Sequence, residues 1–174
     1  GEVASGDIFA RVTPTVDVES IVADIIANVR KNGDKALYEY YEKFDKVKLN
    51  SLAVSEQEIN EAFAAVPAEF LEILREAAEN IRRFHEKQKR NSFILNDQPG
   101  IVVGQKVIPI DRAGLYVPGG TAAYPSSVLM ASIPAKIAGC REICITTAPS
   151  CGETINPVVL AAASWPSKRA HFSK

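Results

Sequence analysis

The chain has 174 residues, 47% of them hydrophobic and 24% charged, and this length suits one ordinary domain or slightly more. With 20 Lys and Arg against 21 Asp and Glu, the net charge of −1 provides no positive field for nucleic acid or for an anionic membrane surface. No apolar run approaches the roughly 18 residues of a membrane span, and the first residues lack the layout of a signal peptide, so we expect a soluble, cytoplasmic protein.

The first part of the chain has the spacing of amphipathic helices. Between residues 18 and 29 apolar side chains recur every three or four positions, and Asp17 is the expected N-cap. Gly33 ends this helix, and the same spacing then continues to Phe44. We therefore predict two consecutive helices.

Two more helices are expected before the pattern changes. Ser55 and Glu58 stand three residues apart and form a capping-box pattern that opens a helix through about Ala65. Pro67 marks the start of a longer helix that ends near Gln88. Residues 1–111 are thus predicted to form a helix-rich region with a short strand or hairpin near its end.

The second part of the chain alternates between strands and helices. Turn residues at 97–100 precede a Val- and Ile-rich stretch at 101–110, which predicts a strand or hairpin. Apolar runs at 115–117 and 143–145 predict two strands around a helix over 126–138, with Ser126 and Ser127 as its caps. A further helix is expected over 156–163. Strand, helix and strand in this order predict a right-handed parallel βαβ unit.

The fold class predicted from this order is α/β: a helical region followed by the start of a Rossmann-like parallel sheet over residues 112–174. The pattern breaks after Ala163, where Trp165 and Pro166 replace a continuing helix. The tail at 165–174 carries bases and no acid. Because apolar strand edges and helix faces would lack partners in such a partial sheet, we expect self-association, as a dimer.

Residues 114–121 carry the most chemical information. The sequence Gly-Leu-Tyr-Val-Pro-Gly-Gly-Thr places a glycine pair between a predicted strand and a helix, where a backbone can approach a ligand. The motif is neither GxGxxG nor a P-loop, and a tight turn is the alternative interpretation. Tyr116 is either a packed strand residue or a ring at the mouth of a site.

Cysteine and histidine residues are few. Cys140, Cys144 and Cys151 show no CxxC spacing, so we expect reduced, packing cysteines rather than a zinc site. His85 is expected to bond its helix neighbours, and His171 has no ligand or catalytic partner near it in sequence. The sequence therefore provides no candidate metal ligand and no candidate catalytic residue.

Residues 114–130, followed by Ile-Pro-Ala-Lys-Ile-Ala-Gly-Cys at 133–140, resemble the most distinctive block of histidinol dehydrogenases. Residues 33–37, 44–45 and 81–88 match the N-terminal pattern of that family in order and spacing. The resemblance covers about residues 18–163. It implies a homodimeric cytoplasmic enzyme with aldehyde dehydrogenase-like α/β domains, which oxidises histidinol to histidine with NAD and zinc.

At the level of residues, the resemblance implies that Tyr116 lies at the NAD site, with Pro118, Gly119 and Gly120 in the adjoining turn. It also implies that the zinc ligands and the Glu-His pair that handles protons lie downstream, in a chain more than twice as long. We therefore expect an N-terminal portion without its own zinc ligands, inactive alone. The tail at 165–174 is expected to be non-family sequence from a frameshift, truncation or engineered end.

Two alternatives remain open at this stage. One is a dehydrogenase of another small polar alcohol in the same family. The other is a non-catalytic nucleotide-binding or assembly module that retains the glycine turn without the chemistry.

Overall fold

The computed structural model describes residues 18–119, 122–149 and 154–164, together with the backbone of 170–173. The chain divides into two compact units, one ending at Lys48 and the other starting at Leu49. Asp17, Gly120 and Cys151, which the sequence interpretation used, lie outside the described residues.

The described part of the first unit is helical. Gly33, with a φ of 57°, separates its first two helices, as the sequence predicts. The predicted second helix ends in a π-helical turn, in which the rings of Tyr40 and Phe44 stack with centroids 5.6 Å apart. Lys46 closes this turn with a φ of 58°. The elements are α2 (Val18–Asn32), α3 (Asp34–Tyr40) and η1 (Tyr41–Asp45).

The second unit begins with two helices, α4 (Glu56–Ala65) and α5 (Ala68–Glu86). The predicted capping box is confirmed: the Glu58 amide donates to Ser55 Oγ at 3.2 Å, and the Ser55 amide donates to Glu58 Oε2 at 2.8 Å. These bonds satisfy two amides that a helix start leaves without partners.

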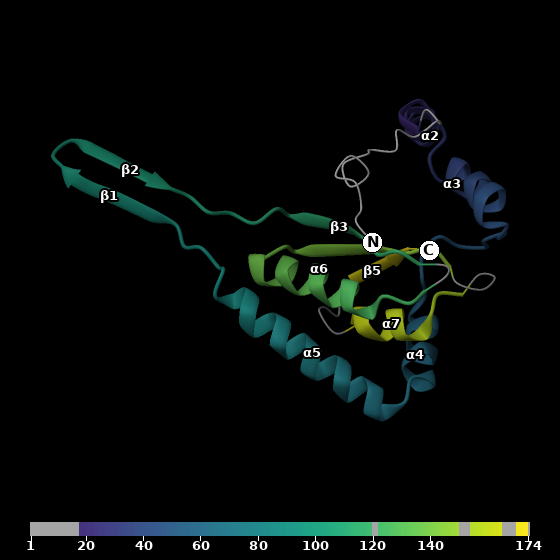
Figure 1. Cartoon of the computed structure of the whole chain (residues 1–174). Coiled ribbons are helices and arrows are strands. Elements are labelled where there is room, and N and C mark those ends of the chain that lie inside the picture. The colour runs from purple at the N-terminus through teal and green to yellow at the C-terminus, as the bar shows by residue number, and fades with distance from the viewer. Residues whose placement is uncertain (1–17, 120–121, 150–153, 165–169, 174) are drawn as a thin grey trace, which may run out of the picture. The chain divides into compact units, whose positions relative to one another are not determined.

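An antiparallel hairpin follows, formed by β1 (Phe93–Gln98) and β2 (Ile101–Gln105) (Figure 1). Leu95 lies opposite Val103. Gly100 has a φ of 81°, which a glycine after proline in a tight turn readily adopts. The hairpin is therefore present, but it starts earlier than predicted. The predicted stretch at 101–110 contains only its second strand, the turn is at 97–100, and the first strand begins at Phe93.

The rest of the unit confirms the βαβ prediction. Its elements are β3 (Arg112–Tyr116), α6 (Pro125–Ala138), β4 (Glu142–Thr146), α7 (Pro157–Ser164) and β5 (Ala170–Ser173). All strand pairs of this sheet are parallel, in the order β3-β4-β5. The sequence did not predict β5, which lies in the tail at 165–174.

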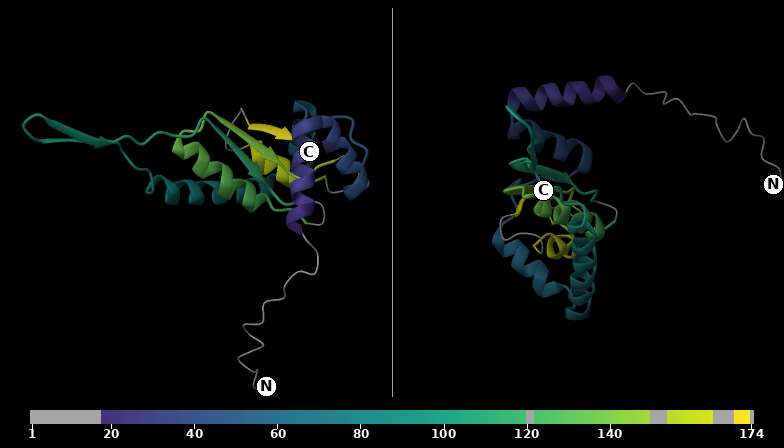
Figure 2. Two further views of the ribbon diagram at one scale, coloured as in Figure 1. Left: turned by 90° about the horizontal axis from the view of Figure 1, so that it is seen from above. Right: turned by 90° about the vertical axis from the view of Figure 1, so that its left-hand side faces the viewer.

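Figures 1 and 2 show that α6 and α7 cover one face of this sheet, with α5 and α4 in a further layer. Helix α5 packs on α6, and α4 packs on α7. The core between these layers contains the most deeply buried side chains of the unit, among them Val117, Val128, Leu129, Ile145 and Val159. Cys140 also lies in this core, as the packing interpretation predicts.

The predicted caps Ser126 and Ser127 are wrong. Helix α6 begins at Pro125, and the N-cap residue is Tyr124, which makes no side-chain cap hydrogen bond. Proline is well suited to the first helical position because its φ is already helical and it has no N–H to satisfy. Because Pro125 starts the helix, Ser126 and Ser127 lie inside it and do not act as N-caps.

Within the described ranges, no helix has the length and apolar character needed to cross a membrane.

The predicted domain boundary at residue 112 lies between the hairpin and the parallel sheet, and both of these belong to the second compact unit. The predicted division into domains stays a prediction.

Candidate functional site at the carboxyl ends of strands β3 and β4

The family-like motif at 114–121 lies where β3 ends. Tyr116 is the last residue of β3 and lies beside Thr146, the last residue of β4. The next residue, Val117, is fully buried, and its amide donates to the Thr146 carbonyl at 2.9 Å. The side chain of Tyr116 is nevertheless 70% exposed. Its ring is therefore available to a ligand at the carboxyl edge, where parallel sheets bind theirs.

The turn after β3 packs closely on the loop after β4. A Cβ added to Gly119 would lie 2.6 Å from Thr147 Oγ1 and would clash with the Ala148 carbonyl. Glycine at this position is thus required by contact between two loops of the chain itself. Pro118, between the buried Val117 and this contact, is exposed.

The loop at 147–148 is the part of this site that the sequence interpretation missed. Thr147 is 3% exposed and directly follows β4. The place of this loop directly after a predicted strand could have identified it, because the carboxyl ends of parallel strands meet at one edge of the sheet.

The amino end of α6 lies downstream of the turn and offers few amide donors. Pro125 has no N–H, and the amides of Ser127 and Val128 both donate to the Tyr124 carbonyl, at 3.1 and 3.4 Å. A helix start binds phosphate through amides that have no partner in the helix. The start of α6 is consequently less suited to binding phosphate than the start of a helix without proline.

The order of the strands also limits the site. Doubly wound sheets bind dinucleotides in the crevice where the strand order reverses. The described strands follow one another as β3-β4-β5, so β3 lies at an edge and no reversal is formed by them. The described residues therefore provide one wall of such a crevice.

The face of the sheet opposite α6 carries polar groups. Arg112 on β3 lies beside Glu142 on β4, and its Nε donates to Glu142 Oε2 at 2.8 Å. Cys144 Sγ donates a long hydrogen bond to Glu142 Oε1 at 3.7 Å. Burial, then the Glu142 charge and this hydrogen bond, raise the pKa of the Cys144 thiol, while the Arg112 charge opposes them. A thiol with a raised pKa is a poor nucleophile at neutral pH.

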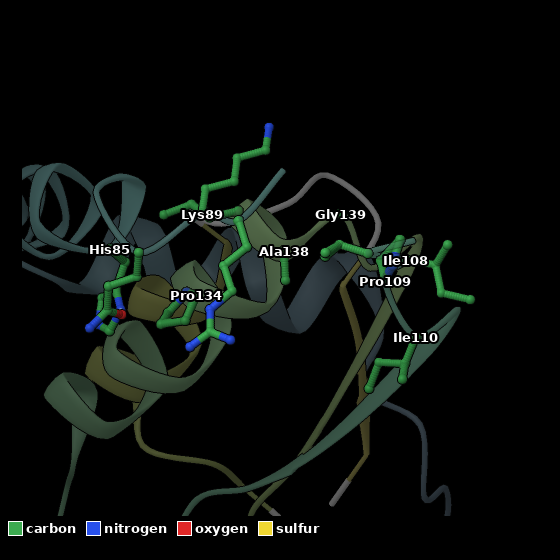
Figure 3. A pocket seen from close by; sticks show the side chains of 12 residues that line it. His85, Lys89, Ile108, Pro109, Ile110, Pro134, Ala138 and Gly139 are labelled. Atoms are coloured by element: carbon green, nitrogen blue, oxygen red, sulfur yellow. The ribbon is translucent and has the colours of Figure 1, made fainter. Parts of the chain in front are cut away.

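A cavity of about 620 Å³ lies elsewhere, between the carboxyl ends of α5 and α6 and the segment at 107–110 (Figure 3). Its walls are largely apolar, with Ile108, Pro109 and Pro134 among them. None of the residues that line it belongs to the glycine turn. Because α6 begins near the carboxyl end of β3 and ends near the amino end of β4, the cavity lies at the opposite edge of the sheet from Tyr116.

His85 lines this cavity and bonds its neighbours, as predicted. Its Nδ1 lies 2.7 Å from Gln88 Oε1, and its ring packs edge-on against Phe84. Across the part of the chain that the structure describes, no three His, Cys, Asp or Glu side chains gather in a way that could hold a metal ion. The described residues thus do not fit a zinc site, and the placement of zinc ligands downstream stays a prediction.

Comparison with known proteins gives a consistent result. A family model described as histidinol dehydrogenase matches residues 10–167, and so reaches into the predicted non-family tail. A histidinol dehydrogenase of Geobacillus kaustophilus is 56% identical over 149 residues, or 86% of this chain and 35% of that protein. One from Methanosarcina mazei is 43% identical over 157 residues, or 90% of this chain and 36% of that protein.

A solved structure is also similar. The crystal structure of histidinol dehydrogenase from Elizabethkingia anophelis superposes with a TM-score of 0.86 at 36% identity, and the match covers 94% of this chain and 38% of that chain. The chain thus spans about a third of the length of the relatives that it matches.

Proposed function

Since the chain belongs to the histidinol dehydrogenase family, an oxidoreductase family, we propose that it supplies one wall of the NAD site of an enzyme that oxidises histidinol to histidine. One observation carries this proposal. The family-specific block at 114–130 includes the end of strand β3 and the beginning of helix α6, with an exposed tyrosine ring at the carboxyl edge of the sheet.

Four described residues of the block have a definite task in this proposal. The exposed ring of Tyr116 provides a flat contact for a ring of the dinucleotide. Val117 anchors the turn in the core, and Gly119 allows it to pack on the loop at 147–148. Pro118 restricts the backbone between them. Gly120, which lies outside the described residues, is proposed to complete the turn.

The rest of the chemistry is proposed to come from residues other than those described. Oxidation of an alcohol to a carboxylate removes two hydrides, by way of an aldehyde and with addition of water, and two NAD molecules in turn would supply the acceptor for them. The same oxidation needs a base for the hydroxyl proton and a group that holds the alcohol oxygen. The described residues contain no metal-binding group for the zinc that the resemblance implies. We therefore propose that the 174-residue chain alone is inactive.

Binding of NAD by the chain alone tests the proposed wall. Because a single wall buries little of a ligand, we expect a dissociation constant of about 1 mM or weaker. Saturation-transfer NMR detects such contacts. The signal should disappear in Tyr116→Ala and persist in Tyr124→Ala, a matched tyrosine before α6 that is 44% exposed. A micromolar constant that Tyr116→Ala abolishes would show a nearly complete site, and a signal that both variants retain would remove Tyr116 from it.

A chimera tests the activity. The 149 residues of the Geobacillus kaustophilus enzyme that match this chain can be replaced by the corresponding residues of the chain. We expect the chimera to reduce NAD when given histidinol and to form histidine. A folded chimera that oxidises only another small polar alcohol would instead identify a different substrate within the family. A folded chimera with no activity on either would contradict the proposal.

The proposal also includes a homodimer in the cytoplasm, which the resemblance implies. Support for the dimer comes from the exposed apolar residues of the second unit. Light scattering at about 10 μM should give twice the mass of the chain, and a clean monomer would contradict the dimer.

A further inference from the structure

Thr146 is a polar residue that lies directly beside Tyr116 at the carboxyl edge of the sheet. The two residues end strands β4 and β3 and are partners in the parallel register. Four residues earlier on the same strands, the Arg112 and Glu142 side chains form an ion pair on the face opposite α6. Because side chains alternate between the two faces along a strand, Tyr116 and Thr146 share that open face.

The burial of β4 agrees with this placement. Ile143 and Ile145 are 2% and 1% exposed and belong to the core, whereas Thr146 is only partly buried. The structure shows no hydrogen bond between the Thr146 hydroxyl and another described residue. This hydroxyl is thus open to a ligand that also reaches the Tyr116 ring.

The strand pair holds the Thr146 side chain in a defined position. Its carbonyl accepts a hydrogen bond from the amide of Val117 at 2.9 Å, and Val117 is fully buried. A β-branched side chain also has few favourable rotamers. Little conformational entropy is therefore lost when the hydroxyl binds a ligand.

The position and charge of this edge indicate which part of a dinucleotide the hydroxyl would meet. In many NAD-binding sheets an acidic side chain about 20 residues after the glycine turn bonds the 2′-hydroxyl of the ribose. Here the next strand after the turn ends in Thr146, and the described residues at the two strand ends, 116–119 and 146–149, include no Asp or Glu. A threonine hydroxyl can accept the same hydrogen bond without a charge.

We propose that Thr146 is a binding residue for the adenosine ribose of NAD. Its hydroxyl accepts a hydrogen bond from the ribose 2′-hydroxyl, while the Tyr116 ring contacts the adjoining adenine. The inference rests on the proposed function, because it assigns a further residue to the proposed NAD site. It makes the end of β4, as well as the turn after β3, part of the wall that this chain supplies.

The chimera with the Geobacillus kaustophilus enzyme allows the contact to be measured in a complete active site. Thr146→Val keeps the shape of the side chain and removes its hydroxyl. We expect the KM for NAD to rise about fivefold, the loss typical of one neutral hydrogen bond, with kcat unchanged. Thr146→Ser, which keeps the hydroxyl, should restore the KM. Cys144→Val, a matched change two residues earlier on the same face, should leave it unaltered.

An NAD analogue that contains 2′-deoxyadenosine separates the ribose contact from an effect on the fold. The unaltered chimera should show a KM for this analogue about fivefold above that for NAD, and Thr146→Val should raise it no further. If Thr146→Val leaves the KM for NAD unchanged, or weakens NAD and the analogue equally, the ribose contact is wrong. Either result in an active chimera contradicts this inference alone, whereas a folded chimera without activity contradicts the proposed function and the inference together.

Discussion

Strand β4 and strand β2 have similar residues and opposite surroundings. Ile145 of β4 is 1% exposed, whereas Val102 of β2 is 72% exposed. Helix α6 packs on the first, whereas the second pairs with strand β1. A run of β-branched residues thus predicts a strand in both places but does not tell which part of a protein covers it. In β4 the cover is provided by this chain, whereas the side chains of β2 are exposed.

The largest contrast is expected from truncation of apolar side chains. Leu129→Ala in α6 removes a side chain that is 1% exposed, and should lower the free energy of unfolding by about 3 kcal/mol because it leaves a cavity. Val102→Ala in the hairpin should change the unfolding of the monomer by less than about 0.5 kcal/mol. Urea unfolding at low protein concentration measures both. Similar losses for the two variants would mean that the hairpin belongs to the core.

A smaller loss is expected at the glycine turn. Gly119→Ala places a Cβ against Thr147 and Ala148, and should cost about 1–3 kcal/mol through overpacking. Gly114→Ala in β3 is the matched control, because an added Cβ there meets nothing within 4 Å. We expect the control to unfold within about 0.5 kcal/mol of the unaltered chain. Equal stability of the two variants would show that the two loops do not pack as described.

A change confined to the hairpin should have a local effect. A Cβ at position 104 would lie 2.5 Å from the Phe93 carbonyl oxygen on the paired strand. Gly104→Ala should therefore accelerate hydrogen exchange of the amides in β1 and β2. Exchange in β3 and β4 should stay unchanged, because the hairpin strands pair with each other. Acceleration throughout the second unit would show that the hairpin and the sheet unfold together.

The smallest effect concerns the open face of the sheet. The raised pKa of Cys144 stabilises the fold below the pKa of the unfolded thiol, and this stability is lost as pH rises through the higher pKa of the folded one. Stability should thus decline slightly in alkaline solution. Alkylation of Cys144, followed by peptide mass spectrometry, should shift to lower pH in Glu142→Gln, since a neighbouring negative charge is removed. An unchanged pH profile would leave burial as the only cause of the raised pKa.

Local signals in the sequence predicted most of the elements. The capping box at Ser55 and Glu58, the glycine at 33 and the βαβ order all act between residues close in sequence, so their patterns are visible there. The first strand of the hairpin was missed because its turn residues were assigned to a connection. Strand β5 was missed because its pairing with β4 depends on a distant part of the chain.

The site was predictable in part for the same reason. The family block identified Tyr116 and its turn, and the structure places this tyrosine, exposed, at the carboxyl edge. The loop at 147–148 contacts Gly119 from a position 28 residues further along the chain (147 − 119 = 28), and the sheet brings the two loops together. The ion pair between Arg112 and Glu142 likewise depends on strand register, which a sequence pattern does not specify.

The strand order β3-β4-β5 also affects how the second unit folds. Each new strand is added directly beside the one that precedes it in the chain, after a single helix. Each pair of neighbouring strands is therefore separated by one helical crossover of about 30 residues, and closing such a loop costs less entropy than a connection that skips a strand would. A ribosome that releases this segment residue by residue can thus release one βαβ step after another, each able to pack before the next has been made.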